Sequence, residues 1–321
     1  MEHVGGRSDH GGFANVDCLL CVEATIRLRF DVGFDEGMIA GRSRRPFIVD
    51  TDIGSDVDDA MVLSAVSRFS ALSLIGVTCV YGDVSLRAKI ALKYLRGSGL
   101  GQVPVYCGES APISGRQVWY SGLEGSALGN LSEFAGRDGG VDFLVRSARE
   151  FSGELEILAI GPLTNIARAM EVDGGFASRV KRIWIMGGDY SRDFAEHNMK
   201  CDVVAAQKVF ASGVAITVMP LDVTRQVAIP VSDFDFLGES DLGREIRLWA
   251  EFKKLDINNP HDLMALLSVV DGGLFDVSEA GGVVVSDNGV TTHSIGDGNV
   301  SIVRSCDVSR VKAAVLAALG G

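Results

Sequence analysis

The sequence predicts an α/β fold with an open, mostly parallel, Rossmann-like sheet flanked by helices. Short apolar and β-branched runs alternate with stretches of helical periodicity from Phe47 to Met219. The apolar runs are continuous, which is typical of parallel strands buried on both faces. With 321 residues, of which 47% are hydrophobic, the chain is also long and apolar enough to enclose a large core.

The alternation predicts the elements in order. Strands are expected at residues 47–49, 72–80, 103–106, 154–160, 181–186 and 214–219, and helices at about 58–69, 86–95 and 260–270. The glycines of 97–101 follow a helix rather than a strand, which predicts a helix end and not a dinucleotide-binding turn. In such sheets ligands bind beyond the carboxyl ends of the strands. The loops expected to carry chemistry are therefore 50–59, 81–84, 160–165 and 186–198.

Residues 1–44 differ from the rest of the chain, and we expect residues 45–321 to form the functional domain. The first segment carries Gly-Gly pairs, scattered charges and a basic cluster at its end, which is typical of a poorly ordered extension or of a start site placed too far upstream. Its Cys18 and Cys21 form a C-x-x-C without a second pair or a flanking strand and helix, so coincidence is the favoured interpretation. Six cysteines are too few for a disulfide framework, which agrees with a reducing compartment.

Charge and hydropathy exclude several classes of partner. The formal net charge of −12 would repel a nucleic-acid backbone or an anionic membrane surface. No apolar stretch approaches the roughly 20 residues that cross a bilayer, and the N-terminus has no secretory-signal pattern. We therefore expect a soluble, cytoplasmic protein.

An acidic run follows the first expected strand. It places five carboxylates within ten positions: Asp50, Asp52, Asp56, Asp58 and Asp59. These groups would repel one another strongly unless a cation lay among them. Carboxylate oxygens without nearby Cys or His favour calcium or magnesium over zinc.

Three functions fit this loop taken alone. It could serve a metal-dependent hydrolase, a phosphotransferase whose D-x-D holds a nucleophile, or a calcium loop without catalysis. An EF-hand fails on spacing, because counting from Asp50 puts the glycine at position five and Met61 where the bidentate glutamate belongs. The D-x-D phosphatase is not excluded by the loop, although its expected later lysine beside an acidic pair is not evident.

The remaining motifs favour the hydrolase. From about Phe47 to the C-terminus the chain resembles the inosine-uridine-preferring nucleoside hydrolases, which are ribonucleoside N-ribohydrolases. The resemblance is carried by segments in the family's order and approximate spacing, namely 50–60, 76–83, 159–167, 186–188, 195–198, 221–224 and 261–262. It implies the nucleoside hydrolase fold and cleavage of the N-glycosidic bond of a ribonucleoside to free base and ribose.

The resemblance also implies a Ca²⁺ site and a catalytic base. The metal ligands would be Asp52, Asp59, Asp262 and the backbone carbonyl of Ile160. Asp52 would also take the proton from a calcium-bound water, because calcium lowers the pKa of water only modestly. Cleavage passes through an oxocarbenium-like state, which a carboxylate-rich site stabilises.

The same resemblance assigns the sugar and the leaving group. The substrate-binding residues would be Asp58, Asp83, Glu196, Asn198 and Met186. His261 resembles the family's candidate general acid, and the alternative is that it only packs the start of the helix that follows Pro260. For His197, which lies between two expected sugar binders, a structural and a functional role are equally expected.

Some positions depart from the family pattern. Ser121 stands where a histidine is common, and residues 189–195 lack the usual extra asparagine. Asp56 lies in a lengthened part of the acidic loop and has no assigned role. Trp119 and Tyr120 are expected either to stack on the base or to pack the core, and Trp249 to pack. These departures keep open a catalytically impaired calcium- and ribose-binding member; the expected assembly is a dimer or tetramer.

Overall fold

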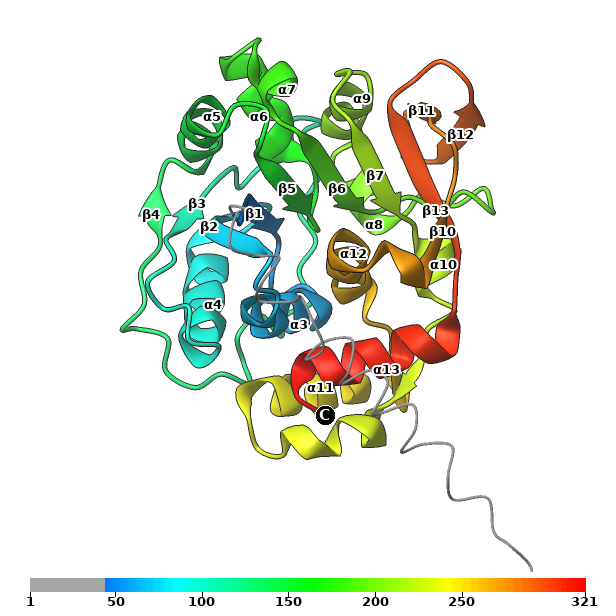
Figure 1. Ribbon diagram of the computed structural model, residues 1–321. Helices are drawn as coiled ribbons and strands as arrows, with labels where there is room; N and C mark the ends of the chain where they lie inside the picture. The colour runs from blue at the N-terminus through cyan, green and yellow to red at the C-terminus, as the bar shows by residue number, and fades with distance from the viewer. Residues whose placement is uncertain (1–43) are drawn as a thin grey trace, which may run out of the picture. The chain divides into compact units, whose positions relative to one another are not determined.

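Strand β1 (Arg45–Thr51) lies in the interior of the sheet, with a strand on each side, and its side chains pack into a hydrophobic core on each face. The computed structural model describes residues 44–321 (Figure 1). Successive side chains of a strand point to opposite faces. Phe47 and Val49 accordingly pack in one hydrophobic core, and Ile48 packs in the other. A strand buried on both faces needs a continuous apolar run, which is the pattern that Phe47 to Val49 provide.

The main sheet has eleven strands among the described residues, in the order β12-β11-β13-β7-β6-β5-β1-β2-β3-β4, with β10 paired to β13. All pairs from β13 to β4 are parallel, whereas β10, β11 and β12 run antiparallel to their neighbours. The other strands are β2 (Leu72–Cys79), β3 (Val105–Cys107), β4 (Arg137–Asp138), β5 (Glu156–Ala159), β6 (Arg182–Met186), β7 (Ile216–Met219), β10 (Phe275–Val277), β11 (Gly281–Val285), β12 (Thr291–Ile295) and β13 (Val300–Cys306). A separate antiparallel pair joins β8 (Ile229–Pro230) to β9 (Ile257–Asn258).

Helices cover both faces of the sheet (Figure 1). One face packs against α5 (Gly140–Glu150), α6 (Thr164–Val172), α7 (Phe176–Arg179) and α9 (Val203–Phe210). The other core contains α3 (Asp58–Ala65), α4 (Val84–Gly97), α11 (Asp241–Lys253), α12 (His261–Val270) and α13 (Val308–Leu319). Two short helices, α8 (His197–Cys201) and α10 (Leu221–Thr224), follow β6 and β7. No helix within residues 44–321 is long and apolar enough to cross a membrane.

The α/β fold and the mostly parallel sheet predicted from the sequence are confirmed. Each strand expected from the apolar runs is present, and α4 ends at Gly97 as its glycines predicted. The α-helix expected over 58–69 ends at Ala65 and continues as a 3-10 turn to Arg68. The antiparallel strands after residue 274 were not predicted, because β12 is largely exposed and lacks a continuous apolar run. The predicted extension, residues 1–44, lies outside the described residues except for Arg44, and so do Cys18 and Cys21.

Candidate active site

A pocket of about 280 Å³ opens at the carboxyl ends of the central strands. Asp52, Ile160 and Met186 follow or end β1, β5 and β6, which are neighbours in the sheet. The other lining residues are Ser55, Asp56, Asp58, Asp59, Trp119, Phe194, Glu196, His197, Asn198, Leu221, Trp249, His261 and Asp262. Of the four loops expected to carry chemistry, 50–59, 160–165 and 186–198 supply lining residues, whereas 81–84 supplies none.

Three carboxylates converge where two helices begin. Asp58 and Asp59 form the first turn of α3, and Asp262 lies in the first turn of α12. One oxygen of each lies within 4.8 Å of the others, and the Asp262 N–H donates to Asp58 Oδ2 at 3.3 Å. Helix N-termini favour negative charge, but three carboxylates this close still repel one another. The cluster contains two of the predicted metal ligands, Asp59 and Asp262, together with Asp58, which was expected to bind the sugar.

Burial makes these carboxyl groups hard to ionise when no cation is present. Loss of hydration raises the pKa of Asp58 to about 8, with repulsion from Asp56 as the next cause. Burial, followed by repulsion from neighbouring carboxylates, raises the pKa of Asp59 and Asp262 well above the usual range. Asp52 Oδ2 lies buried without a hydrogen-bond partner. This excess of hard oxygen donors fits a divalent cation.

Asp50 lies behind the pocket rather than in it. Its Oδ1 accepts hydrogen bonds from the Thr78 hydroxyl at 2.5 Å and from the Asn165 amide at 2.7 Å. Burial raises the pKa of Asp50 to about 7. Its contacts tie β1, β2 and α6 together beneath the acidic loop, which agrees with a scaffold role.

Two features hold the backbone of Asp52 in place. Gly161 packs closely against it, and the buried Arg87 side chain, which the sequence did not single out, donates hydrogen bonds to it. A Cβ on Gly161 would lie 2.9 Å from the Asp52 backbone nitrogen and carboxylate, so only glycine fits there. Arg87 of α4 donates to the carbonyl oxygens of Asp52 and Ile53 and, at 2.9 Å, to the Ser55 hydroxyl. Arg87 thereby fixes the backbone that presents Asp52. It was missed because one arginine in a helix carries no signal of this contact.

Replacing Arg87 with lysine should disorganise this loop without removing the positive charge. Lysine is a point donor and cannot span the carbonyl groups that the guanidinium fork holds. We expect catalytic turnover to fall by about 10-fold to 10²-fold and the melting temperature to fall, because buried carbonyl acceptors lose partners. Steady-state kinetics and thermal denaturation of R87K check this. Wild-type values for both quantities would show that Arg87 does not organise the loop.

Glu196 and Asn198 are fixed at the start of α8. The Glu196 carboxylate accepts from the backbone N–H groups of Asn198 at 3.0 Å and Met199 at 3.2 Å, which caps the helix. Asn198 Nδ2 donates to the carbonyl oxygens of Ile160 at 2.9 Å and Met186 at 3.2 Å. The side-chain amide of Asn198 thus links the ends of β5 and β6. The Ile160 carbonyl, which was predicted to bind the metal, accepts one of these two hydrogen bonds.

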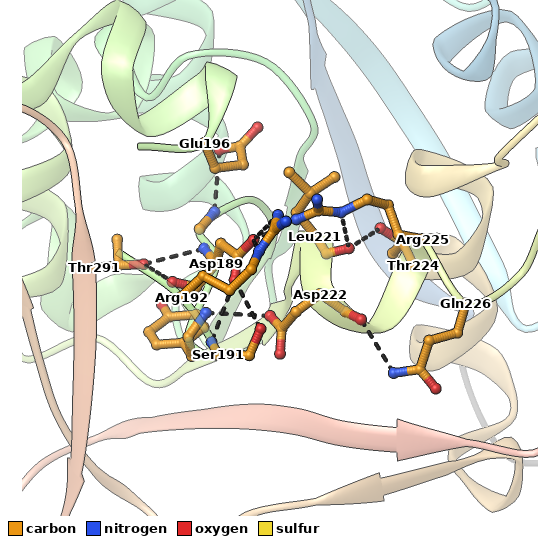
Figure 2. A network of polar contacts seen from close by, with 12 residues as sticks. Asp189, Ser191, Arg192, Glu196, Leu221, Asp222, Thr224, Arg225, Gln226 and Thr291 are labelled. Carbon is orange, nitrogen blue, oxygen red and sulfur yellow. Dashed lines mark hydrogen bonds and ion pairs between the residues drawn. The ribbon is translucent and has the colours of Figure 1, made fainter. Parts of the chain in front are cut away.

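An ion-pair network supports the loop that precedes Glu196 (Figure 2). The fully buried Asp189 carboxylate pairs with Arg192 and Arg225. The backbone of Asp189 exchanges hydrogen bonds with the Thr291 hydroxyl on β12. Arg225 also donates to the Leu221 carbonyl at 3.3 Å. One of the antiparallel strands that the sequence did not predict, β12, therefore contacts the loop before Glu196 through Thr291.

His261, which the resemblance suggested as a general acid, lines the pocket. Its Nδ1 lies 2.7 Å from the Thr224 hydroxyl. Burial, and then the positive charges of Lys253 and Arg225, lower the pKa of His261 to about 3. This environment disfavours the charged ring, and an uncharged ring can still donate a hydrogen bond through its N–H.

Asp83 is not brought to the pocket, which corrects its predicted role in substrate binding. Its exposed carboxylate accepts from the Leu86 N–H at 2.9 Å and caps α4. The motif resembled a binding loop, but an aspartate before a helix is also the usual N-cap. Asp56, which had no assigned role, pairs with Lys253 at 2.8 Å and so links the acidic loop to α11.

The pocket is polar and buried at its base but aromatic at its rim. Trp119 and Phe194 are 45% and 44% exposed, whereas every carboxylate of the cluster is at most 4% exposed. Trp249 is buried at the rim and stacks on Phe252 with the ring centroids 5.1 Å apart. Tyr120 is half exposed and does not line the pocket. The backbone N–H of Ser121 donates to the Glu124 carboxylate at 2.8 Å. A ligand with a polar end and a flat ring suits this gradient.

A family model and several known proteins match this chain. The model of the inosine-uridine preferring nucleoside hydrolase family matches residues 47–313. The chain is 34% identical over 220 residues to uridine nucleosidase 1 of Arabidopsis thaliana, covering 64% of this chain and 65% of that protein. It is 31% identical over 198 residues to the pyrimidine-specific ribonucleoside hydrolase RihB of Escherichia coli, covering 57% of this chain and 61% of that protein. The matches thus span less than two thirds of these relatives.

Solved structures show the same fold. A plant nucleoside hydrolase, the PpNRh1 enzyme, superposes with a TM-score of 0.75 and 26% identity, over 86% of this chain and 99% of that one. A purine-preferring ribonucleoside hydrolase from Gardnerella vaginalis superposes with a TM-score of 0.77 and 22% identity, over 86% and 98% of the two chains. At 22% identity the second likeness shows the fold alone.

Proposed function

This chain belongs to the inosine-uridine preferring nucleoside hydrolase family, and from that premise we propose that it hydrolyses the N-glycosidic bond of ribonucleosides. The observation that carries the proposal is the pocket's gradient from buried carboxylates to an exposed aromatic rim. The sugar would occupy the polar base and the nucleobase the rim. The products would be a free base and ribose.

The residues at the base of the pocket suit a divalent cation, which we propose to be Ca²⁺. Asp52, Asp59, Asp262 and the Ile160 carbonyl would hold it, with Asp58 close enough to join them. When bound, the cation would supply positive charge that offsets these carboxylates and fixes the hydroxyl groups of the sugar. The fit rests on the crowded, buried oxygens and on the unpartnered Asp52 Oδ2.

Each polar side chain has a task in the proposed reaction. Asp52 takes a proton from the attacking water as the bond from oxygen to C1′ forms. Glu196, Asn198 and Asp58 hold the sugar hydroxyls, which aligns C1′ with that water. The negative cluster stabilises the positive charge that develops on the sugar as the bond from C1′ to the base breaks. His261 lines the same pocket and is proposed to donate a hydrogen bond to the departing base.

A substrate panel tests the proposal. Purified protein with Ca²⁺ should release ribose from at least one of uridine, cytidine, inosine and adenosine, measured as reducing sugar. It should not release phosphate from p-nitrophenyl phosphate with Mg²⁺, which a D-x-D phosphatase would do. Nucleoside binding without any ribose release would instead identify a catalytically impaired member of the family.

A further inference from the structure

His197 is a pocket residue whose ring is held from two sides. It begins α8, between the proposed sugar binders Glu196 and Asn198, and its side chain is exposed to the pocket. The Trp119 ring meets it edge-on with centroids 5.5 Å apart and an interplanar angle of 79°. The Tyr81 ring meets it at 6.3 Å and 86°. These two edge-on contacts restrict the orientation of the His197 ring.

One ring nitrogen of His197 is already engaged. Its Nε2 lies 3.5 Å from Cys201 Sγ, one turn further along α8. Burial raises the pKa of the Cys201 thiol to about 12, so the sulfur keeps its proton at neutral pH. A protonated thiol can donate to Nε2. In that arrangement Nε2 is the acceptor, and the ring N–H that faces away from Cys201 is on Nδ1.

Tyr81 packs against Cys201 as well as against the His197 ring. Its hydroxyl oxygen accepts a hydrogen bond from the backbone N–H of Trp119 at 2.8 Å, which holds the Tyr81 side chain in place. Tyr81 thereby positions both Cys201 and the His197 ring.

The backbone of Tyr81 is also unusual. It has a φ of 68°, a left-handed conformation that a bulky residue rarely adopts. Arg87 Nε donates to the Tyr81 carbonyl at 2.5 Å, and the Tyr81 N–H donates to the Glu109 carbonyl at 2.8 Å. Strained conformations held from both sides concentrate at functional sites. Here the strain accompanies the placement of the Tyr81 side chain against His197 and Cys201.

We infer that Tyr81 and Cys201 hold His197 with its proton on Nδ1, and that this N–H donates a hydrogen bond to the leaving base. The inference rests on the proposed function. As the bond to C1′ breaks, the base keeps the electron pair, and an acceptor such as pyrimidine O2 or purine N3 gains negative charge. A positioned donor stabilises that charge more than it stabilises the intact nucleoside. Tyr81 and Cys201 act as positioning residues.

Two kinds of leaving group test this. His197→Phe keeps a flat ring and removes the donor, so kcat/KM for uridine and inosine should fall about 10²-fold. For p-nitrophenyl β-D-ribofuranoside, whose leaving group departs as a stable anion, the fall should be under about 3-fold. Tyr81→Phe and Cys201→Ala should show the same selective loss at about 10-fold, and Cys201→Ser, which retains a donor, should restore most of it.

His293→Phe is the matched control. His293 also meets a tyrosine ring edge-on, at 6.4 Å from Tyr190, but it does not line the pocket, so the ratio between the two substrates should not change. Equal losses on both substrates in His197→Phe, or no loss on either, would overturn the inference while leaving the proposed function intact. Wild-type protein that releases ribose from no nucleoside would overturn the proposed function and the inference with it.

Discussion

Replacing Asp52 with asparagine is expected to lower kcat for nucleoside hydrolysis by at least about 10³-fold. Asparagine keeps the shape of the side chain but cannot take a proton from water, and it removes one negative charge from the proposed cation site. Asp52 Oδ2 is buried at the carboxyl end of β1 with no hydrogen-bond partner, so no structural contact of that oxygen is lost. Ribose release under saturating substrate and Ca²⁺ measures the effect.

Asp83→Asn is the matched control for this substitution. Asparagine caps a helix as well as aspartate, and Asp83 lies outside the pocket lining, so stability and turnover should both stay near wild type. A D52N protein that keeps more than about a tenth of wild-type kcat would not use Asp52 as its base. A large loss of turnover in D83N would instead support the substrate-binding role that the sequence motif predicted for Asp83.

The parts of the site that the sequence predicted are those placed by the rule of strand ends. Asp52 follows β1, Ile160 follows β5 and Met186 ends β6, and a parallel sheet brings those ends together. Asp262 joins them from the far end of the chain, and only the resemblance to a family pointed to it. The apolar strands themselves were predictable because burial on both faces leaves a continuous pattern.

What the sequence could not give depends on contacts between distant segments. Arg87 is an unremarkable residue of an amphipathic helix until α4 packs beside the acidic loop. The pKa of His261 depends on burial and on the charges of Lys253 and Arg225, and only the folded chain brings these groups near the ring. Asp83 was misjudged because the same residue type serves both as a helix cap and as a sugar ligand.

Removal of the proposed cation should abolish turnover and make stability fall as the pH rises. The folded state of the cation-free protein holds Asp58 with its pKa raised from the ordinary 3.8 to about 8. A carboxyl group with a raised pKa in the folded state stabilises the fold fully only below its unfolded pKa. That stability is lost as pH rises through the folded pKa. Cation-free protein should therefore become less stable between pH 5 and pH 8.

The size of the effect follows from the linkage. Each pH unit between the two pKa values costs about 1.4 kcal/mol for one such group. If only half of that is realised over three units, the loss is about 2 kcal/mol, which lowers the melting temperature by about 3 °C in a domain of this size. Asp59 and Asp262, whose pKa values burial also raises, act in the same direction, whereas His261, whose pKa is lowered, acts in the opposite direction only below its ordinary pKa of about 6.5.

Scanning calorimetry of chelator-treated protein at pH 5 and pH 8, with and without added Ca²⁺, measures both effects. A cation that binds only the folded state should raise the melting temperature most at pH 8, where the carboxylates are charged. At a cation concentration of a hundred times Kd, the free energy of unfolding should rise by about 2.7 kcal/mol. Asp262→Asn should remove this response and the turnover together, because it takes one carboxylate from the cluster. Full turnover in the chelated protein would exclude a catalytic cation, and a melting temperature that rises from pH 5 to pH 8 without Ca²⁺ would contradict the raised pKa values of the buried aspartates.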